Sequence, residues 1–324
     1  MKLLDFVKNF KDEASCEKYL RKERERQGLV CSQCGCTKMY WDKCHKRWVC
    51  KQCRHEITLK SGTVMHGSKL PIMYWFTALH LLTSMKNSIS TLEIKRQLSH
   101  KRYQPIWEMV HKIRSIMGIR DEQYQLSRSV EIDEAFFTTD NEEVQSTKEL
   151  GEELKRGVGS QRKVKVLVMI ESEKSTNPKP NQKEKKCGHL RMEILKDLKA
   201  ETIKEAVAKD INPESTGVMD ASKSHNKVED VLKEVQKEVV KPKEAPKLLP
   251  WVHIAISNAK SRIDNLYHGI KSEFLQYYLD EFVYKFNRRF FEDKLFDRVM
   301  VATISYRANF KHRLYNKNLS DNCG

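Results

Sequence analysis

The sequence predicts an α+β protein, in which short helices and a small cysteine-rich β-module precede a larger domain of strands and helices. Three observations predict it: two Cys-x-x-Cys pairs near the N-terminus, apolar residues at helical spacing after Pro71, and short β-branched runs after Ser129. A chain of 324 residues is long enough for two domains and a small third one. We expect N-terminal helices in residues 1–28, the β-module in 29–66, a helical segment in 67–120, the larger domain in 127–295 and a C-terminal tail in 296–324.

The charge balance of the chain is strongly basic. Sixty Lys and Arg residues stand against 44 Asp and Glu, and the net charge of +16 points to a polyanionic partner, nucleic acid before membrane. Hydrophobic residues make up 39% and charged residues 32%, which excludes wholesale disorder and a collagen-like fold. No run approaches the roughly 18 to 20 apolar residues that span a bilayer, and the first residues turn acidic too early for a secretory signal. We therefore expect a cytoplasmic protein without a membrane partner.

The N-terminal part combines helical and strand-like patterns. Residues 29–60 are cysteine-rich and strand-like, and a Ser-Gly turn in LKSGT closes this stretch. After Pro71, a residue favoured in the first turn of a helix, the pattern becomes helical. Before residue 28, apolar residues at helical spacing predict two short amphipathic helices, with Leu3, Phe6, Val7 and Phe10 in the first and Cys16, Tyr19 and Leu20 in the second.

Two more helices are expected before residue 120. The first begins at about Ser90, the chain breaks from Ser99 to Lys101, and the second carries Trp107. This is the outline of a helix-turn-helix, but a plain helical bundle fits the periodicity equally well. Polar residues at the break are candidates for contacts with DNA, although a solvated turn is the commoner explanation for such residues. They are His100, Lys101, Arg102 and Gln104.

The C-terminal half alternates strand-like and helical patterns. The runs VEIDEAFF, KVKVLVMIE and HLRMEIL predict strands, and the helical AETIKEAVAKDI precedes a further strand-like run, GVMDAS. This order predicts an α/β or α+β domain. The polar stretches between the first three runs are expected to be surface loops, and residues 233–250, with three prolines, a linker. A last long helix is expected from about Ser272 to Phe291, with Phe274, Tyr278, Phe282 and Phe286 on one stripe.

The cysteine pattern predicts a metal site. Cys31 and Cys34 form one Cys-x-x-Cys pair, Cys50 and Cys53 form the second, and fifteen residues separate the pairs. At this spacing two turns meet to give a tetrahedral thiolate site, for which zinc is the expected ion. Neighbouring residues that could replace a ligand are Cys36, Cys44, His45 and His55. Zinc ribbons are mostly structural, and we expect this one to hold the basic residues Lys43, Lys46 and Arg47 against nucleic acid.

Two aspartates interrupt or end apolar strands. Asp133 lies in VEIDE, where alternation places Glu131 and Asp133 on one face of the strand and Glu134 on the other. Asp220 directly follows an apolar pair and precedes a Ser-containing turn. Carboxylates in such places are costly without a cation or another partner, and on neighbouring strands both would reach one divalent ion. Taken singly, a strand-end aspartate is more often a turn former.

Four passages resemble the bacterial insertion-sequence transposases of the IS fifteen-ninety-five family. They are SCEKYLRKERERQGLVCSQCG, VCKQCRHEITLKSGTVMHGSKLPIMYWFTALHLL, VEIDEAFF and YHGIKSEFLQYYLDEFVYKFNRRFF, and SGTVMHGSKLP and YLDEFVYKFNRR are the specific elements within them. The resemblance covers nearly the whole chain. It implies a zinc ribbon, a helical DNA-binding segment and an RNase H-like mixed-sheet domain with an acidic catalytic triad usually called DDE. The first two catalytic residues would be Asp133 and Asp220.

The third catalytic position departs from the family's common pattern. Members commonly have a glutamate followed seven residues later by a lysine, ahead of a Gly-x-Tyr-His element, and in this chain Tyr267 and His268 anchor the register. In that register Lys260 takes the lysine position and His253 stands where glutamate would be. The segment WVHIAISNAK resembles a subgroup in which histidine is the usual third residue, with Asn258 as the alternative. An imidazole ligand is better matched to Mn²⁺ than to Mg²⁺, and His253 could instead serve as a general acid or base.

The resemblance also implies an activity and its partners. It implies a transposase that binds the terminal inverted repeats of an insertion sequence and catalyses strand cleavage and strand transfer, with structural Zn²⁺ and catalytic Mg²⁺ or Mn²⁺. Its partners would be double-stranded terminal and target DNA, and a second copy in the synaptic complex, at the nucleoid. The expected DNA contacts are Lys46, Arg47, Lys101, Arg102 and Lys260. The alternative is a catalytically inactive zinc-ribbon DNA-binding regulator, and a repair nuclease ranks last.

Overall fold

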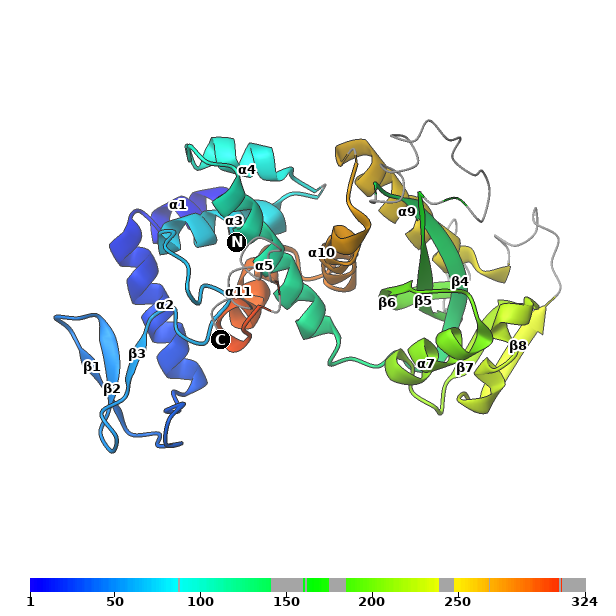
Figure 1. The fold of residues 1–324 in the computed structure, drawn as a ribbon, viewed down its shortest axis with the longest axis horizontal. Coiled ribbons are helices and arrows are strands. Elements are labelled where there is room, and N and C mark those ends of the chain that lie inside the picture. The colour runs from blue at the N-terminus through cyan, green and yellow to red at the C-terminus, as the bar shows by residue number, and fades with distance from the viewer. Residues whose placement is uncertain are drawn as a thin grey trace, which may run out of the picture. The chain divides into compact units, whose positions relative to one another are not determined.

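The computed structural model describes residues 1–86, 88–140, 160, 162–174, 185–238, 248–267, 269–308 and 310. The chain divides into two units, each of which is described by itself. The N-terminal unit consists of Met1–Arg120 with Phe290–Gly324, and the sheet unit consists of Asp121–Arg289 (Figure 1). Most of the two expected loops between the first three strands, and His268, lie outside the described residues. In the described part of the chain, no helix combines the length and the apolar character needed to cross a membrane.

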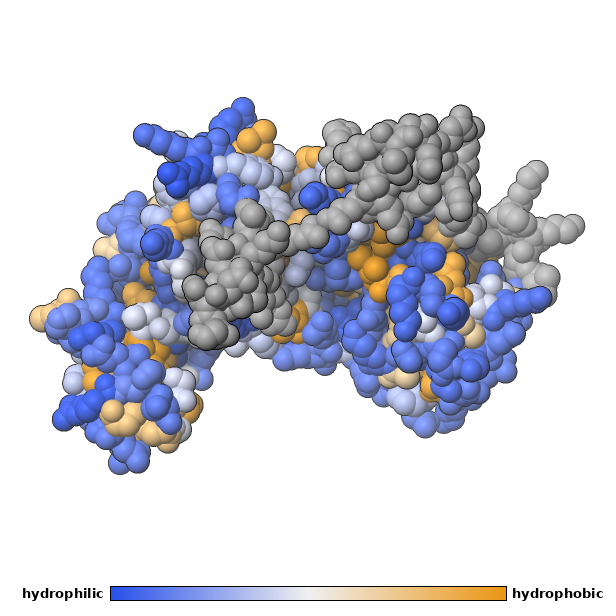
Figure 2. Space-filling view, in the orientation of Figure 1, coloured by the Kyte–Doolittle hydropathy of each residue, from blue (hydrophilic) through white to orange (hydrophobic). Residues whose placement is uncertain are grey.

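The N-terminal unit contains the expected pattern of helices around a small sheet. Its helices are α1 (Leu3–Asn9), α2 (Glu13–Gln27), α3 (Ile72–Ser84), α4 (Thr91–Gln97), α5 (Gln104–Asp121) and α11 (Leu295–Ser305). Its antiparallel sheet has the order β1 (Met39–Asp42), β2 (Arg47–Cys50), β3 (Glu56–Thr58). The two short N-terminal helices and the break between α4 and α5 are confirmed. On the face drawn in Figure 2, hydrophilic residues cover most of the surface and hydrophobic residues form small separate patches.

An aromatic cluster holds the helices of this unit together. Phe10, just after α1, contacts Phe76 of α3 edge-on with ring centroids 5.0 Å apart, and both contact Phe296 of α11. All three rings are buried, and edge-to-face packing of this kind adds to the hydrophobic gain of burial. Most of α11 lies in the segment that we expected to be a C-terminal tail. The apolar face of α11 packs residues 295–305 onto the aromatic core of the N-terminal unit.

The three-stranded sheet is fixed to α2 by polar contacts as well as by packing. The buried guanidinium of Arg24 donates hydrogen bonds to the carbonyl oxygens of Thr58, at 2.6 Å, and Leu59, at 2.9 Å. The indole N–H of Trp48 donates to Glu25 at 3.2 Å. Because a buried arginine must find acceptors for its donors, these bonds tie the end of the small sheet to the helix before it.

The sheet unit has the strand order and directions of an RNase H-like fold. Its five-stranded sheet has the order β6 (Lys185–Leu195), β5 (Lys163–Lys174), β4 (Ser129–Thr138), β7 (Thr216–Asp220), β8 (Glu234–Glu238). β6, β5 and β4 are antiparallel, whereas β4, β7 and β8 are parallel. Its helices are α7 (Ala200–Asp210), α9 (Pro250–Leu266) and α10 (Leu275–Asn287). The mixed sheet with its helices confirms the expected fold class.

Helices cover the two faces of the sheet with separate hydrophobic cores (Figure 1). On one face, Ala135 and Phe137 of β4 pack with apolar residues of α9 and α10. On the other face, Val130 and Ile132 of β4 pack with apolar residues of α7. Because side chains alternate along a strand, the odd-numbered residues of β4 face α9 and the even-numbered ones face α7. This alternation decides which neighbours the acidic residues of β4 meet.

The expectation of a linker over residues 233–250 was wrong for its first part. Residues 234–238 form β8, which pairs in parallel with β7 at the edge of the sheet. Val235 is partly buried and packs on the core beneath the sheet, while the charged residues beside it are suited to an exposed edge strand. The three prolines all lie after this strand, so none removes a hydrogen-bond donor from it. The last of them, Pro250, is the first residue of α9.

The YLDEFVYKFNRR passage ties the end of α10 to the rest of the sheet unit. The guanidinium of Arg288 pairs with the carboxylate of Asp121, and both side chains are almost fully buried. Asn287 donates to the carbonyl oxygen of Leu190 and to Asp121, and it accepts the N–H of Leu190 at 2.7 Å. The passage therefore has a structural role, since it fixes α10 against β6.

We predict that Arg288→Ala lowers the free energy of unfolding by about 3–5 kcal/mol, because it leaves the carboxylate of Asp121 buried without its cation. The matched control is Arg96→Ala, which breaks the exposed pair with Glu93 and should cost at most about 1 kcal/mol. Denaturant unfolding of both variants measures the difference. Equal losses for the two substitutions would contradict the proposed role of the buried pair.

Candidate active site and zinc site

The two predicted catalytic aspartates lie on neighbouring strands at the centre of the sheet. β4 and β7 are parallel, with Glu131 opposite Val218, and Asp133 and Asp220 each follow two residues further along. Asp220 is the last residue of β7. The side chain of Asp133 is 20% exposed and that of Asp220 is 49% exposed. Both carboxylates are therefore within reach of solvent at one end of the sheet.

The environment of Asp133 disfavours its charged form. Burial raises the pKa of Asp133 to about 6, and the negative charges of Glu134 and Asp220 act in the same direction. The N–H of Glu134, which donates to Asp133 at 2.8 Å, and the nearby His253 act in the opposite direction. A divalent cation would relieve the repulsion among these carboxylates. Carboxylate oxygens are ligand types that both Mg²⁺ and Mn²⁺ accept, whereas the imidazole is better matched to Mn²⁺.

Glu131 holds the first turn of α9 against β4. Its buried carboxylate accepts hydrogen bonds from the backbone N–H groups of Trp251, at 2.8 Å, and Val252, at 3.0 Å. These donors lack partners within the helix, and a carboxylate at this end also interacts favourably with the helix dipole. Pro250 brings no N–H to the turn, and the N–H of His253 reaches the carbonyl of Leu249. The start of α9 is thereby satisfied by one residue of the central strand.

This contact brings His253 to Asp133. Nδ1 of His253 lies 3.6 Å from Oδ2 of Asp133. Nε2 of His253 is buried and has no hydrogen-bond partner in the described part of the chain. Lys260 lies two turns further along α9, with Nζ 5.9 Å from the ring centroid of Phe137 on β4. Asn258 is exposed and lies about 140° around the helix axis from His253.

His225, which sequence reasoning did not single out, contacts the carboxylates of Glu134 and Asp220 on the face of the sheet opposite α9. It follows β7 in a 3₁₀ turn, Lys223–His225, and its side chain is 0% exposed. Its Nδ1 lies 2.9 Å from Oδ1 of Asp220, and its Nε2 lies 3.1 Å from Oε1 of Glu134. Burial disfavours the imidazolium, but the two carboxylates outweigh this effect and raise the pKa of His225. Asp220 is thus oriented by a buried neighbour.

The predicted active-site residues are adjacent without forming a closed cluster. Among the described residues, only the four cysteines bring three or more potential ligand atoms to within 4.8 Å of one another. Asp133 contacts His253, and Asp220 contacts His225, but the three predicted ligands Asp133, Asp220 and His253 do not meet this condition together. No local pattern marks His225 or the capping role of Glu131, since both depend on contacts between distant residues.

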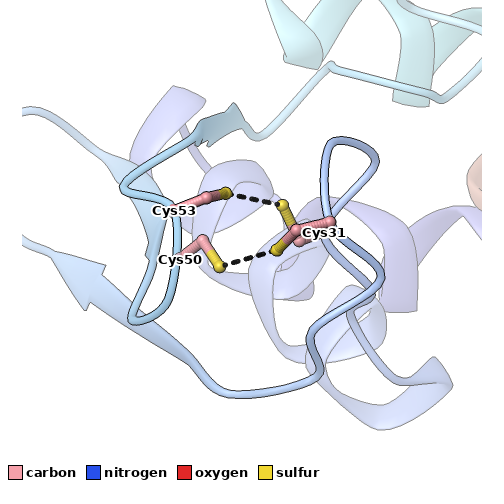
Figure 3. A group of neighbouring side chains, drawn as sticks. Cys31, Cys50 and Cys53 are labelled. Atoms are coloured by element: carbon pink, nitrogen blue, oxygen red, sulfur yellow. Dashed lines mark hydrogen bonds between the residues drawn. The ribbon is translucent and has the colours of Figure 1, made fainter.

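The four cysteines form a compact thiolate site in the N-terminal unit (Figure 3). Sγ of Cys31 lies 3.5 Å from Sγ of Cys53, and Sγ of Cys34 lies 3.6 Å from Sγ of Cys50. A tetrahedral zinc ion with Zn–S bonds of about 2.3 Å separates its sulfurs by about 3.8 Å, so the arrangement fits zinc. The N–H groups of Cys53 and Gln52 lower the pKa of Cys50 to about 6 against the effect of burial. Although the N–H of Cys36 lowers it, the neighbouring thiols raise the pKa of Cys34 to about 12, so the four thiols carry charge in different degrees.

The predicted DNA-binding residues differ in their surroundings. Nζ of Lys46 lies 2.6 Å from the carboxylate of Glu17, and Arg47 pairs with Glu56. Lys101 and Arg102 are exposed at the turn between α4 and α5, and within the described ranges neither pairs with a carboxylate. Lys46 and Arg47 are therefore engaged in ion pairs within the protein. Lys101 and Arg102 are exposed and have no carboxylate partner among the described residues, so they can contact an anion.

We predict that Cys50→Ser removes the bound zinc and loosens the small sheet, because the site loses one of four thiolate ligands. The control is Cys44→Ser, which changes an exposed cysteine outside the cluster and should leave the zinc content unchanged. Metal analysis of the purified chain measures the zinc, and the fluorescence of the buried Trp48 reports on the sheet. Full zinc retention in Cys50→Ser would refute the four-cysteine assignment.

We predict that Glu131→Ala lowers the free energy of unfolding by about 1–3 kcal/mol for each N–H of α9 that it leaves without an acceptor. Glu131→Gln keeps one carbonyl oxygen as an acceptor and should lose less. Denaturant unfolding compares the three chains. If the alanine variant were as stable as the original chain, the capping contact would not hold α9 in place.

Comparison with known proteins agrees with this architecture. The family model described as the ISXO2-like transposase domain matches residues 125–287. The matched region begins just before β4, ends with α10, and includes the five strands and every residue of the candidate active site. A search of curated proteins found no match. The match spans half of the chain, and the protein therefore belongs to the ISXO2-like transposase family.

Proposed function

We propose that this protein binds the terminal inverted repeats of an insertion sequence and catalyses metal-dependent cleavage and transfer of DNA strands. The observation that carries the proposal is the convergence of Asp133 and Asp220 on adjacent parallel strands, with His253 beside Asp133, inside the region that matches the transposase family. The family itself implies that the protein acts on DNA.

Asp133 and Asp220 would hold the catalytic cations, with His253 as a third ligand. When bound, divalent cations lower the pKa of the attacking water or 3′-hydroxyl and stabilise charge on the departing 3′-oxygen. In the first reaction the oxygen of water bonds to phosphorus and the bond to the 3′-oxygen breaks. In the second, the freed 3′-hydroxyl attacks a phosphodiester of the target, whose own 3′-oxygen leaves. The protein forms no covalent bond with DNA in either reaction.

The surrounding residues would position these groups and the substrate. Glu131 holds α9 so that His253 stays next to Asp133, and His225 holds the carboxylate of Asp220. Lys260, along the same helix, would contact a DNA phosphate close to the cut. Synapsis of two transposon ends makes a homodimer the expected assembly. The zinc ribbon would be a structural module that contributes to recognition of the repeats.

A catalytically inactive DNA-binding regulator is the second candidate. One observation favours it: a histidine stands at the third active-site position, where glutamate is common in the family that the sequence resembles. Retention of Asp133, Asp220 and Lys260 favours the enzyme. Strand cleavage by the purified chain distinguishes the two candidates.

We predict that Asp133→Asn and Asp220→Asn each reduce Mn²⁺-dependent cleavage of a terminal-repeat duplex by at least about 1000-fold, because each removes a member of one catalytic unit. Binding of the same duplex should persist. Asp264→Asn, an exposed change further along α9, is the control and should cleave normally. His253→Ala should cleave far more slowly than Asn258→Ala. Equally poor cleavage by the original chain and both aspartate variants, with equal binding, would favour the inactive regulator.

A further inference from the structure

A groove in the N-terminal unit gathers basic side chains from three parts of the chain. It has a volume of about 1090 Å³ and lies between the segment 67–71, the start of α3, and the turn that joins α4 to α5. Among the described residues that line it, Glu108 is the only acidic one. Its basic lining residues are Lys69, His100, Lys101, Arg102 and Lys112. The groove therefore has a strong excess of positive charge.

A second pocket of the same unit shares Lys112 with this groove. It has a volume of about 770 Å³, and besides Lys112 its lining includes His66 and Arg307. No acidic residue lines it in the described part of the chain. Partial desolvation, together with the positive charges of Arg307 and Lys112, lowers the pKa of His66. Lys112 therefore lines both pockets, and the other basic residues of each pocket lie on either side of it in the lining.

The passage SGTVMHGSKLP builds walls of both pockets on a rigid base. Thr63, Val64 and Met65 are buried, and the N–H of Val64 donates to the carbonyl of Thr303 on α11 at 3.0 Å. Nζ of Lys60 donates to the carbonyl of Ser68 at 3.2 Å and to that of Leu70.

Gly62 and Gly67 have φ values of +73° and +70°, which other residues rarely adopt. The passage belongs to the N-terminal unit, whereas the residues of the candidate active site belong to the sheet unit.

The two histidines that line the pockets make hydrogen bonds within the chain, His66 with the N–H of Gly62 and His100 with the backbone of Arg102, whereas the lysines and arginines differ. Within the described ranges, no carboxylate pairs with Lys69, Lys101, Arg102, Lys112 or Arg307. Other cations of the chain do have partners, as Lys46 has Glu17 and Lys204 has Asp230. Like charges that converge without compensation repel one another, and a bound polyanion removes this cost.

We propose that the two pockets form one binding surface for the phosphate backbone of duplex DNA, with Lys112 at its centre. We call it the Lys112 surface. The proposal rests on the proposed function only in taking DNA as the polyanion. Of the described residues, two aromatic side chains line the groove: Trp75 is buried, and Tyr74 contacts His100 edge-on with ring centroids 5.9 Å apart. Five lysine, arginine and histidine side chains line the same groove. Charge neutralisation along a duplex backbone fits this lining better than base stacking.

The test measures binding of the full chain to a labelled duplex of arbitrary sequence at several salt concentrations, without added Mg²⁺ or Mn²⁺. Lys112→Ala and Arg102→Ala should each weaken binding several-fold and reduce the slope of log affinity against log salt by about 0.9 for each phosphate that the variant no longer neutralises. Lys22→Ala changes an exposed lysine of α2 that lines neither pocket, and both quantities should stay unchanged. Zinc content and circular dichroism of each variant confirm that it folds.

Affinities and salt slopes equal to those of the original chain in both groove variants would overturn the proposal. Competition with an unlabelled single strand of equal length and with inorganic phosphate tests the form of the ligand. If the single strand and inorganic phosphate both compete more weakly than unlabelled duplex, the ligand is a duplex backbone. If Lys112→Ala and Arg102→Ala weaken the binding of the single strand but not that of the duplex, the duplex assignment is overturned. Cleavage is measured separately. If the original chain cleaves DNA and the groove variants bind duplex as well as it does, the proposed function is supported and the proposal that the Lys112 surface binds duplex DNA is overturned.

Discussion

The candidate active site depends on the contact between the carboxylate of Glu131 and the first turn of α9. Each partner would be costly alone, because a buried carboxylate needs donors and the start of a helix has N–H groups without acceptors. Oε2 of Glu131 accepts both N–H groups, Nζ of Lys185 lies 3.9 Å from Oε1, and these contacts fix the helix along β4. Asp133 lies two residues beyond Glu131 on the same face of the strand, and His253 follows the two donating residues on the helix. The contact that stabilises the fold therefore also sets the relation between the predicted catalytic groups.

The opposite face of β4 supports the second aspartate in a different way. Glu134 points away from α9 and, with Asp220, contacts the buried ring of His225. One strand thus carries three acidic residues with separate roles, which follow from the alternation of its side chains. Glu131 caps the helix start, Asp133 on the same face meets His253, and Glu134 on the other face helps to position Asp220 through His225. The two predicted catalytic aspartates are therefore each held by a neighbour on a different face of the sheet.

The sequence predicted what depends on local pattern and could not predict what depends on distant contacts. Periodicity identified the N-terminal helices, α7, α10, the strands other than β8, and the faces of Glu131, Asp133 and Glu134, but it identified neither α9 nor α11 as a helix. Spacing identified the cysteine site. β8 escaped prediction because a short polar edge strand next to prolines lacks a strong strand pattern. The capping role of Glu131 joins residues 120 positions apart, and no local signal marks it. The same holds for Lys46 and Arg47, whose basic character suggested DNA contacts but whose carboxylate partners are brought to them only by the fold.

The N-terminal unit also has a helix start whose N–H groups donate to a carboxylate far away in the sequence. This contact helps to fix the passage that lines the Lys112 surface. Glu13 of α2 accepts the N–H groups of Ile72, at 2.7 Å, and Met73, at 2.9 Å, at the start of α3. The preceding residue, Pro71, ends the passage that forms walls of both basic pockets. Fixing α3 in this way therefore fixes one end of the passage, while the bond from Val64 to Thr303 holds its other part. Net charge alone does not locate a binding surface, since many of the cations are paired. What distinguishes the proposed Lys112 surface is a fixed frame that holds together cations for which the described residues supply no carboxylate partner.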